Sequence, residues 1–284
     1  MKLNCAGVSA CVLRGKPAVI GAERLATVTP VGGQIMTGND TSALLARYES
    51  PWTFAGGDIS HPVYSAGKGP PVVVLHELPG MMPECLDLGL ILAERFRVHL
   101  PLLFGEPGEF AMLKNVARLC VSREIHAFAA NKTSPLVGWI RALCRYVKAQ
   151  SGARGVGVVG MCLTGGFALA TIADEAVLAS VVAQPALPLF VHKAALGLSP
   201  EDQAAVRARA AALGPGCVLG LRYAEDKIAP RVKIDTIRGL VGDALRYREY
   251  PGVDHATLTK HRQPEALQET IRFLAERLAA SAAA

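Results

Sequence analysis

From residue 58 onward, hydrophobic and polar positions follow two different periods along the chain. Short, continuous apolar runs such as residues 71–75 and 156–160 are typical of strands that are buried on both faces of a sheet. The segments between such runs place apolar residues three or four positions apart, as at Leu136, Ile140 and Leu143, which is the spacing of one helix face. The pattern therefore predicts buried strands that alternate with amphipathic helices.

These predicted elements define an α/β fold. Strands that alternate with helices form a mostly parallel, doubly wound sheet flanked by helices. The predicted strands are residues 59–65, 71–75, 97–103, 156–160, 178–183, 217–223 and 244–250. The predicted helices are residues 83–96, 123–130, 135–150, 165–175, 200–213, 230–242 and 264–280.

Residues 1–57 do not show this regularity. Their pattern suggests two short strands, at residues 8–13 and 18–20, and a short helix at residues 41–48. We interpret this segment as an N-terminal extension packed on the main domain, which then spans residues 58–284. The 284 residues are enough for a domain with a sizeable core.

Composition and charge narrow the classes of function. The chain is 51% hydrophobic and 19% charged, which is typical of a globular protein. No apolar stretch reaches the ~18 residues that a membrane span requires, so we expect no membrane partner. The net charge is +6, but the basic residues are scattered without interleaved aromatic residues, and a nucleic-acid partner is not expected. A mild positive field would instead help to collect a small anionic substrate.

The seven cysteines are an odd number, and no two of them form a Cys-x-x-Cys pair. This pattern argues against a disulfide framework and indicates a reducing compartment, so we expect the protein in the cytoplasm. His255 and His261 are six residues apart and have no cysteine pair near them in sequence, so a zinc site is not expected. The sequence suggests no other metal and no cofactor.

One apolar run ends in a turn that carries a candidate nucleophile. Residues 157–166 read Gly-Val-Val-Gly-Met-Cys-Leu-Thr-Gly-Gly, with Cys162 where a strand turns into a helix. In the nucleophile elbow, Gly-x-Ser-x-Gly, the reactive residue stands on a strained turn above the sheet. The glycines of the motif let the two backbone segments approach closely. A buried, unreactive cysteine is the alternative interpretation of this motif taken alone.

A cysteine nucleophile needs a base to form the thiolate and a carboxylate to orient that base. Asp226 and His255 follow two of the predicted strands, in the order nucleophile, acid, histidine that α/β-hydrolases use. The spacings are 64 residues from Cys162 to Asp226 and 29 residues from Asp226 to His255. Each residue lies in a loop at the carboxyl end of its strand, where open α/β sheets hold their sites.

Other residues compete for these roles. Glu225 is an alternative acid, and Asp254 and His261 are alternatives on the histidine loop. Asp226 alone would be interpreted as a helix N-cap, and His255 alone as a residue that makes a loop hydrogen bond. Three further histidines have no companion signal: His99, His126 and His192.

The predicted strand at residues 71–75 is followed by a tip, residues 76–81, that reads His-Glu-Leu-Pro-Gly-Met. Backbone amides at this tip are in position to complete an oxyanion hole with the amide of Leu163, the residue after the candidate nucleophile. A glutamate at the tip, Glu77, is unusual for serine esterases. It is either a functional carboxylate or a solvated loop residue.

At this point the chain resembles the dienelactone hydrolase family over residues 58–280. That family has Gly-x-Cys-x-Gly-Gly at the elbow, Asp-x-x-x-Pro in the acid loop, Gly-x-x-His in the histidine loop and a Glu at the end of an early strand. The corresponding residues here are Gly160-Met161-Cys162-Leu163-Thr164-Gly165-Gly166, Asp226-Lys227-Ile228-Ala229-Pro230, Gly252-Val253-Asp254-His255 and Glu77.

The resemblance implies an α/β-hydrolase fold and a Cys-His-Asp triad that opens an ester or a lactone. In the family the Glu takes the thiol proton when substrate binds, which implies this role for Glu77. Cys162 would then attack the carbonyl, and the amides of Leu78 and Leu163 would hold the oxyanion. His255 would activate water to release the acyl group.

Two departures from the family pattern bear on the substrate. Thr164 stands where the elbow usually has a glycine, and we expect it to narrow the pocket. The family has an arginine shortly after the histidine that grips the substrate carboxylate, but Thr259 stands at that offset, with Lys260 beside it. Arg123 and Lys260 are the candidate contacts for an anionic substrate.

The leading hypothesis is a cytoplasmic hydrolase that cleaves a small ester or lactone, as a monomer or small homo-oligomer. A general carboxylesterase or thioesterase is the alternative among enzymes. A non-catalytic binding relative of the fold is the alternative from another class. The complete set of Cys162, Asp226, His255 and Glu77 argues against a binding relative.

Overall fold

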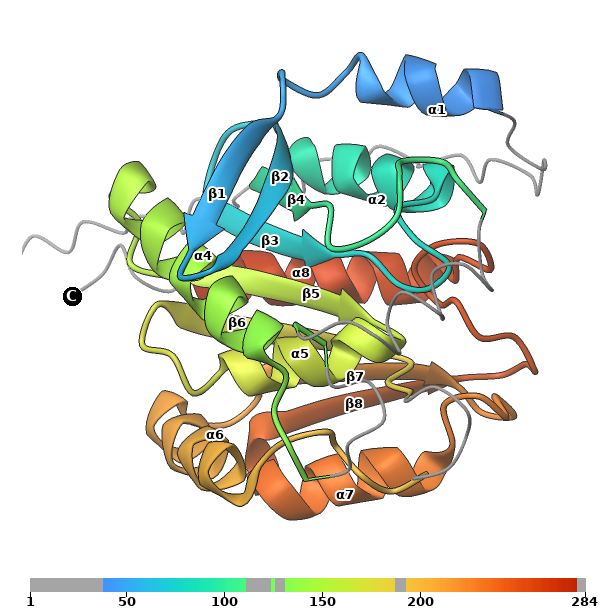
Figure 1. Ribbon diagram of the computed structural model, residues 1–284. Helices are drawn as coiled ribbons and strands as arrows, with labels where there is room; N and C mark the ends of the chain where they lie inside the picture. Colours follow the sequence, from blue (N-terminus) through green and yellow to red (C-terminus); the bar gives the residue numbers. More distant parts are fainter. Residues whose placement is uncertain (1–37, 111–123, 126–130, 187–192, 280–284) are drawn as a thin grey trace, which may run out of the picture. The chain divides into compact units, whose positions relative to one another are not determined.

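In the part of the chain that the structure describes, a single sheet holds eight strands (Figure 1). The structure is a computed structural model, and it describes residues 38–110, 124–125, 131–186 and 193–279. These residues fall within one compact unit, Gly33–Ala284. The strands predicted at residues 8–13 and 18–20 lie outside the described residues, as does the helix predicted at 123–130 apart from residues 124 and 125. Arg123, His126 and His192 also lie outside them.

The strand order across the sheet is β1-β2-β4-β3-β5-β6-β7-β8. The strands are β1 (Trp52–Gly56), β2 (Ile59–Ala66), β3 (Pro71–Leu75), β4 (Arg97–Pro101), β5 (Val156–Met161), β6 (Val177–Ala183), β7 (Val218–Tyr223) and β8 (Leu245–Tyr250). β2 pairs antiparallel with β1 and with β4, whereas all the other pairs are parallel. The parallel strands therefore bring their carboxyl ends to one edge of the sheet.

Helices cover both faces of this sheet (Figure 1). They are α1 (Gly38–Leu45), α2 (Pro83–Ala93), α4 (Pro135–Ser151), α5 (Leu163–Thr171), α6 (Pro200–Leu213), α7 (Arg231–Val241) and α8 (Pro264–Ala279), with a 3-10 turn, η2 (Gly242–Ala244). Apolar side chains of α4, α5, α6 and α7 pack in one core, and those of α1, α2 and α8 pack in a second. Because side chains alternate along a strand, Val73 and Leu75 join the first core and Val72 and Val74 the second.

The predicted α/β fold with a mostly parallel sheet is confirmed. Most predicted elements differ from the observed ones only at their ends, as for the helix predicted at residues 83–96, which ends at Ala93. The N-terminal part differs more, because β1 pairs with β2 and the sheet therefore begins before residue 58. The side chains of β1 alternate between exposed and half-buried, so this edge strand lacks the continuous apolar run of the central strands.

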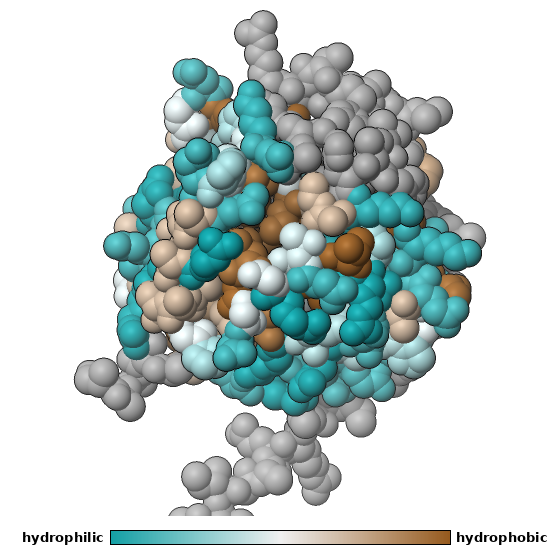
Figure 2. Space-filling model, turned by 90° about the horizontal axis from the view of Figure 1, so that it is seen from below, coloured by the Kyte–Doolittle hydropathy of each residue, from teal (hydrophilic) through white to brown (hydrophobic). Residues whose placement is uncertain are grey.

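The described surface is largely hydrophilic on the face that Figure 2 shows, with a smaller group of hydrophobic residues near the centre of the view. The exposed large hydrophobic side chains include Val232 at the start of α7. Ile228 and Val253, in the loops after β7 and β8, are also exposed. None of the described helices is both long enough and apolar enough to span a membrane.

Candidate active site

Cys162 stands at a sharp turn between β5 and α5. Its backbone has φ 53° and ψ −119°, a conformation that is strained for any residue other than glycine. A Cβ atom on Gly160 would lie 2.2 Å from the carbonyl oxygen of Thr164 and 2.7 Å from Cβ of Ala168. The turn therefore requires glycine at position 160. Cys162 is partly exposed, whereas the other described cysteines are buried.

Thr164, which the sequence suggested would narrow the pocket, has its hydroxyl bonded to the backbone within the elbow. Its side chain is fully buried, and its hydroxyl accepts a hydrogen bond from the amide of Met161 at 2.9 Å. Its single proton can be donated to the carbonyl oxygen of Met161 at 2.9 Å or to that of Leu75 at 3.1 Å. The threonine therefore makes hydrogen bonds at the elbow, and within reach of the end of β3, that a glycine at this position could not make.

The two loops that follow β7 and β8 bring Asp226 and His255 together. Nδ1 of His255 lies 2.7 Å from Oδ2 of Asp226. Oδ1 of Asp226 accepts hydrogen bonds from the amides of Ile228 at 2.8 Å and Ala229 at 3.0 Å. Every carboxylate oxygen of Asp226 is therefore engaged. Glu225, the alternative acid, is exposed.

This contact changes the pKa of both partners. Burial lowers the pKa of His255, but the hydrogen bond to Asp226, together with hydrogen bonding and charge at Cys162, outweighs it and raises the pKa from 6.5 to about 10. Burial raises the pKa of Asp226, but its hydrogen bonds, first of all to His255, bring it below its ordinary value. Both shifts favour the form of the pair in which the imidazole is protonated and the carboxylate is ionised. Nε2 of His255 is buried and makes no well-aligned hydrogen bond within the described ranges, which leaves it for Cys162 or a substrate.

Glu77 lies just beyond β3 and is buried rather than solvated. Oε1 accepts a hydrogen bond from the hydroxyl of Thr259, and Oε2 accepts one from Nε2 of Gln184 at 3.2 Å. Oε1 of Gln184 in turn accepts hydrogen bonds from the amide and the hydroxyl of Thr257. Gln184 therefore connects Glu77 with the segment that follows His255.

Burial is the largest influence on Glu77 and raises its pKa. The hydrogen bond from Thr259, the charge of His255 and the hydrogen bond from Gln184 each act in the opposite direction without cancelling burial. The donors that touch the carboxylate, a hydroxyl and an amide, are neutral. Glu77 is consequently a more basic carboxylate than a solvated one.

The family model for the dienelactone hydrolase family matches residues 59–278. The chain belongs to the dienelactone hydrolase family. The matched residues include the elbow, Glu77 and the loops of Asp226 and His255. The comparison with curated protein sequences finds no match.

Solved structures with this fold include several hydrolases. A candidate dienelactone hydrolase from Klebsiella pneumoniae subsp. pneumoniae has a TM-score of 0.59 at 19% identity, over 81% of this chain and 97% of that one. A candidate lipase from Acinetobacter baumannii has a TM-score of 0.57 at 14% identity, over 88% and 100%. The naproxen esterase of Bacillus subtilis has a TM-score of 0.54 at 14% identity, over 83% and 95%. At these identities the likeness shows the α/β-hydrolase fold, while membership of the dienelactone hydrolase family supports a hydrolytic enzyme.

The remaining candidate residues of this dienelactone hydrolase family member differ from one another in burial and in their contacts. Leu163 is buried as the first residue of α5, and Leu78 is half-buried at the tip of β3. Lys260 is exposed. His261 lies 3.8 Å from Asp254, and both are at least partly exposed. His99 hydrogen bonds to Ser65 within the sheet.

Sequence reasoning missed Gln184 and the partnership of Thr259 with Glu77. Gln184 directly follows the carboxyl end of β6, as Glu77, Cys162, Asp226 and His255 follow the ends of β3, β5, β7 and β8. A polar residue at each carboxyl end was thus the available signal. Across the described ranges, no group of three or more histidine, cysteine, aspartate or glutamate residues is placed to hold a metal ion.

Proposed function

We propose that this protein hydrolyses a small ester or lactone with Cys162 as the nucleophile. The observation that carries the proposal is the part-buried hydrogen bond of 2.7 Å between Asp226 and His255, together with the interaction of Cys162 with the same imidazole, which raises the pKa of His255. A nucleophile, a base and a carboxylate that orients the base are the components of covalent acyl transfer. The strained, partly exposed position of Cys162 supports its role as the attacking group.

The reaction begins when Glu77 accepts the thiol proton. Its raised pKa supports this role, because a more basic carboxylate is a better proton acceptor. The Cys162 thiolate attacks the carbonyl carbon, and the backbone amides of Leu78 and Leu163 stabilise the oxyanion. The bond to the leaving oxygen then breaks, and the imidazolium of His255 protonates that oxygen. The acyl group remains on sulfur as a thioester.

Hydrolysis of the thioester restores the enzyme. His255, now neutral, takes a proton from a water molecule, and the resulting hydroxide attacks the thioester carbonyl. The thiolate leaves and recovers its proton from Glu77, so that the resting thiol, carboxylate and imidazolium are regained. Asp226 stays ionised and orients the imidazole throughout.

The residues around Asp226 and His255 bear on the substrate class. Exposed Ile228 and Val253 lie two residues from Asp226 and His255, which favours apolar groups on the substrate. Lys260 is the described candidate for contact with an anionic group. A reducing compartment such as the cytoplasm suits a free catalytic thiol and the free cysteines at 85, 144 and 217.

Purified protein tests the proposal with p-nitrophenyl acetate, a neutral lactone, a lactone that carries a carboxylate, and an acyl thioester. We expect turnover of at least one ester or lactone, and trapping at low pH should show the acyl group on the peptide that contains Cys162. A Lys260→Ala variant should lose activity only toward the anionic lactone if Lys260 contacts it. Binding of these compounds without turnover would instead indicate a non-catalytic relative, and preference for the thioester would indicate a thioesterase.

A further inference from the structure

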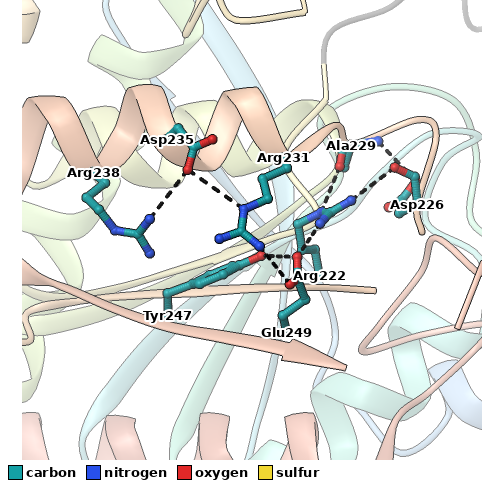
Figure 3. Close-up of polar contacts among 8 residues, drawn as sticks. All are labelled: Arg222, Asp226, Ala229, Arg231, Asp235, Arg238, Tyr247 and Glu249. Carbon is teal, nitrogen blue, oxygen red and sulfur yellow. Dashed lines mark hydrogen bonds and ion pairs between the residues drawn. The ribbon is translucent and has the colours of Figure 1, made fainter. Parts of the chain in front are cut away.

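Arg222 lies beneath the loop that carries Asp226. It is the fifth residue of β7, and only 2% of it is exposed (Figure 3). Nε donates a hydrogen bond to the carbonyl oxygen of Ala229 at 3.0 Å, and Nη2 donates one to the carbonyl oxygen of Asp226 at 3.2 Å. One buried guanidinium therefore holds both ends of the four-residue turn from Asp226 to Ala229.

The same guanidinium is itself held in place by the neighbouring strand. Nη1 donates to Oε1 of Glu249 in β8. That oxygen also accepts a hydrogen bond from the hydroxyl of Tyr247 at 2.6 Å, and Oε2 of Glu249 accepts one from Arg231 at 3.1 Å (Figure 3). The planar guanidinium is thus anchored on one side to β8 and directed on the other toward the loop, an arrangement that requires its several fixed donors.

The loop is closed from both sides as a result. Its carbonyl groups at Asp226 and Ala229 point to Arg222, and its amides at Ile228 and Ala229 point to Oδ1 of Asp226. With Oδ1 engaged, Oδ2 is left to face His255. The orientation of this carboxylate therefore depends on the backbone that Arg222 holds.

We propose that Arg222 is a positioning residue that sets the Asp226–His255 hydrogen bond through the backbone of the acid loop. This inference rests on the proposed function, in which Asp226 orients His255. Arg222 contacts no reacting atom in that mechanism. It acts on the rate because a small displacement of Asp226 misdirects the imidazole.

The first test is Arg222→Lys, which keeps the positive charge beside Glu249 but cannot donate in three fixed directions. We expect kcat to fall roughly 10- to 100-fold, with KM changed less than about twofold. Arg141→Lys is the matched control, because Arg141 also pairs with an aspartate, Asp202 at 2.7 Å, and with a carbonyl, that of Ala170 at 2.6 Å. This control should retain wild-type kcat.

The second test asks whether Arg222 acts through Asp226. In an Asp226→Asn background, Arg222→Lys should have little further effect on kcat, because the hydrogen bond that it positions is already impaired. Multiplication of the two single losses would show instead that Arg222 contributes only general stability. Glu249→Gln weakens the hydrogen bond that holds Arg222 but changes no residue of the loop. Its kcat should therefore fall less than that of Arg222→Lys.

A third measurement does not depend on turnover. The His255 imidazole is titrated by NMR in wild type and Arg222→Lys, with its signal assigned by its loss in His255→Gln. We expect a lower His255 pKa in Arg222→Lys and an unchanged one in Arg141→Lys. An unchanged pKa together with wild-type kcat in Arg222→Lys overturns the positioning role. If wild type hydrolyses no ester, the proposed function fails while the titration still reports on the positioning role.

Discussion

The hydroxyl of Thr259 donates a hydrogen bond to Oε1 of Glu77, which joins two residues 182 positions apart in the chain. Thr259 stands four residues after His255, where the sequence comparison with the family expected an arginine. The partner of Glu77 at this position is therefore a neutral donor rather than a cation. Because a cation would lower the pKa of Glu77 further, its replacement leaves the carboxylate more basic.

Glu77→Gln should make the resting thiol more reactive and the enzyme slower. In the proposed mechanism Glu77 faces Cys162 from the end of the neighbouring strand, and a carboxylate there disfavours a resting thiolate, because like charges in a partly buried site repel each other. The amide removes this repulsion and also removes the proton acceptor. We expect faster alkylation by iodoacetamide and lower kcat, measured over a pH series by mass spectrometry of the peptide that contains Cys162.

Thr259→Val serves as the control for this prediction, because it removes the hydroxyl donor and keeps the carboxylate. Its alkylation rate should rise less than that of Glu77→Gln, because the carboxylate is still present. Identical alkylation profiles for wild type and Glu77→Gln would show that Glu77 does not influence the thiol. The proton-transfer role would then be lost even if Cys162, Asp226 and His255 remained essential.

Cys162→Ala should remove nearly all ester turnover and leave the fold intact, since the nucleophile would be absent and a methyl group fits the same space. Cys162→Ser should also have a low kcat, because a base suited to a thiol is badly matched to a hydroxyl of much higher pKa. Cys162→Gly should melt at a higher temperature than Cys162→Ala, because the backbone at φ 53° costs any non-glycine residue about 1–3 kcal/mol. Steady-state kinetics and thermal unfolding measure these effects. Substantial kcat in the alanine variant would rule out Cys162 as the nucleophile.

Replacement of His255 should cost more activity than replacement of Asp226. The histidine transfers protons in both half-reactions, whereas the aspartate only orients it. We expect His255→Ala to lower kcat/KM by at least about 1,000-fold and Asp226→Asn by roughly tenfold less than that. The reverse order would contradict the assignment, and full activity in Asp226→Asn would redirect attention to Glu225.

The stabilising effect of Asp226 should decline as the pH rises. The pKa of His255 is raised on folding from 6.5 to about 10. A group of this kind stabilises the folded state fully below its unfolded pKa, and the contribution is lost as the pH rises through the folded pKa. Asp226→Asn removes the main partner, so its difference in melting temperature from wild type should be largest near pH 6 and shrink toward pH 10.

Asp202→Asn is a matched control for this dependence, because it breaks an ion pair that contains no histidine, that of Asp202 with Arg141. Its difference from wild type should be the same throughout. A difference for Asp226→Asn that is equally constant would mean that His255 is not charged at neutral pH.

The central strands could be predicted well because their burial is visible locally. All residues of β3 and β5 are buried, so each had to be a continuous apolar run. The strand β1 could not be predicted in this way, since it lies at an edge and its side chains alternate between half-buried and exposed. Its place in the sheet depends on pairing with β2, a contact that no local pattern records.

The sequence by itself determined which loops carry Cys162, Asp226 and His255, because motif, order and strand ends are all local features of the chain. Only the tertiary structure decided what surrounds them. The hydroxyl of Thr164 lies within hydrogen-bond distance of the carbonyl oxygen of Leu75, and the hydroxyl of Thr259 donates to Glu77. The guanidinium of Arg222 donates to the carbonyl groups of the acid loop. Hydrogen bonds of this kind depend on side-chain direction and on distances between strands that are not neighbours in sequence, and these are set by the packing of the whole sheet.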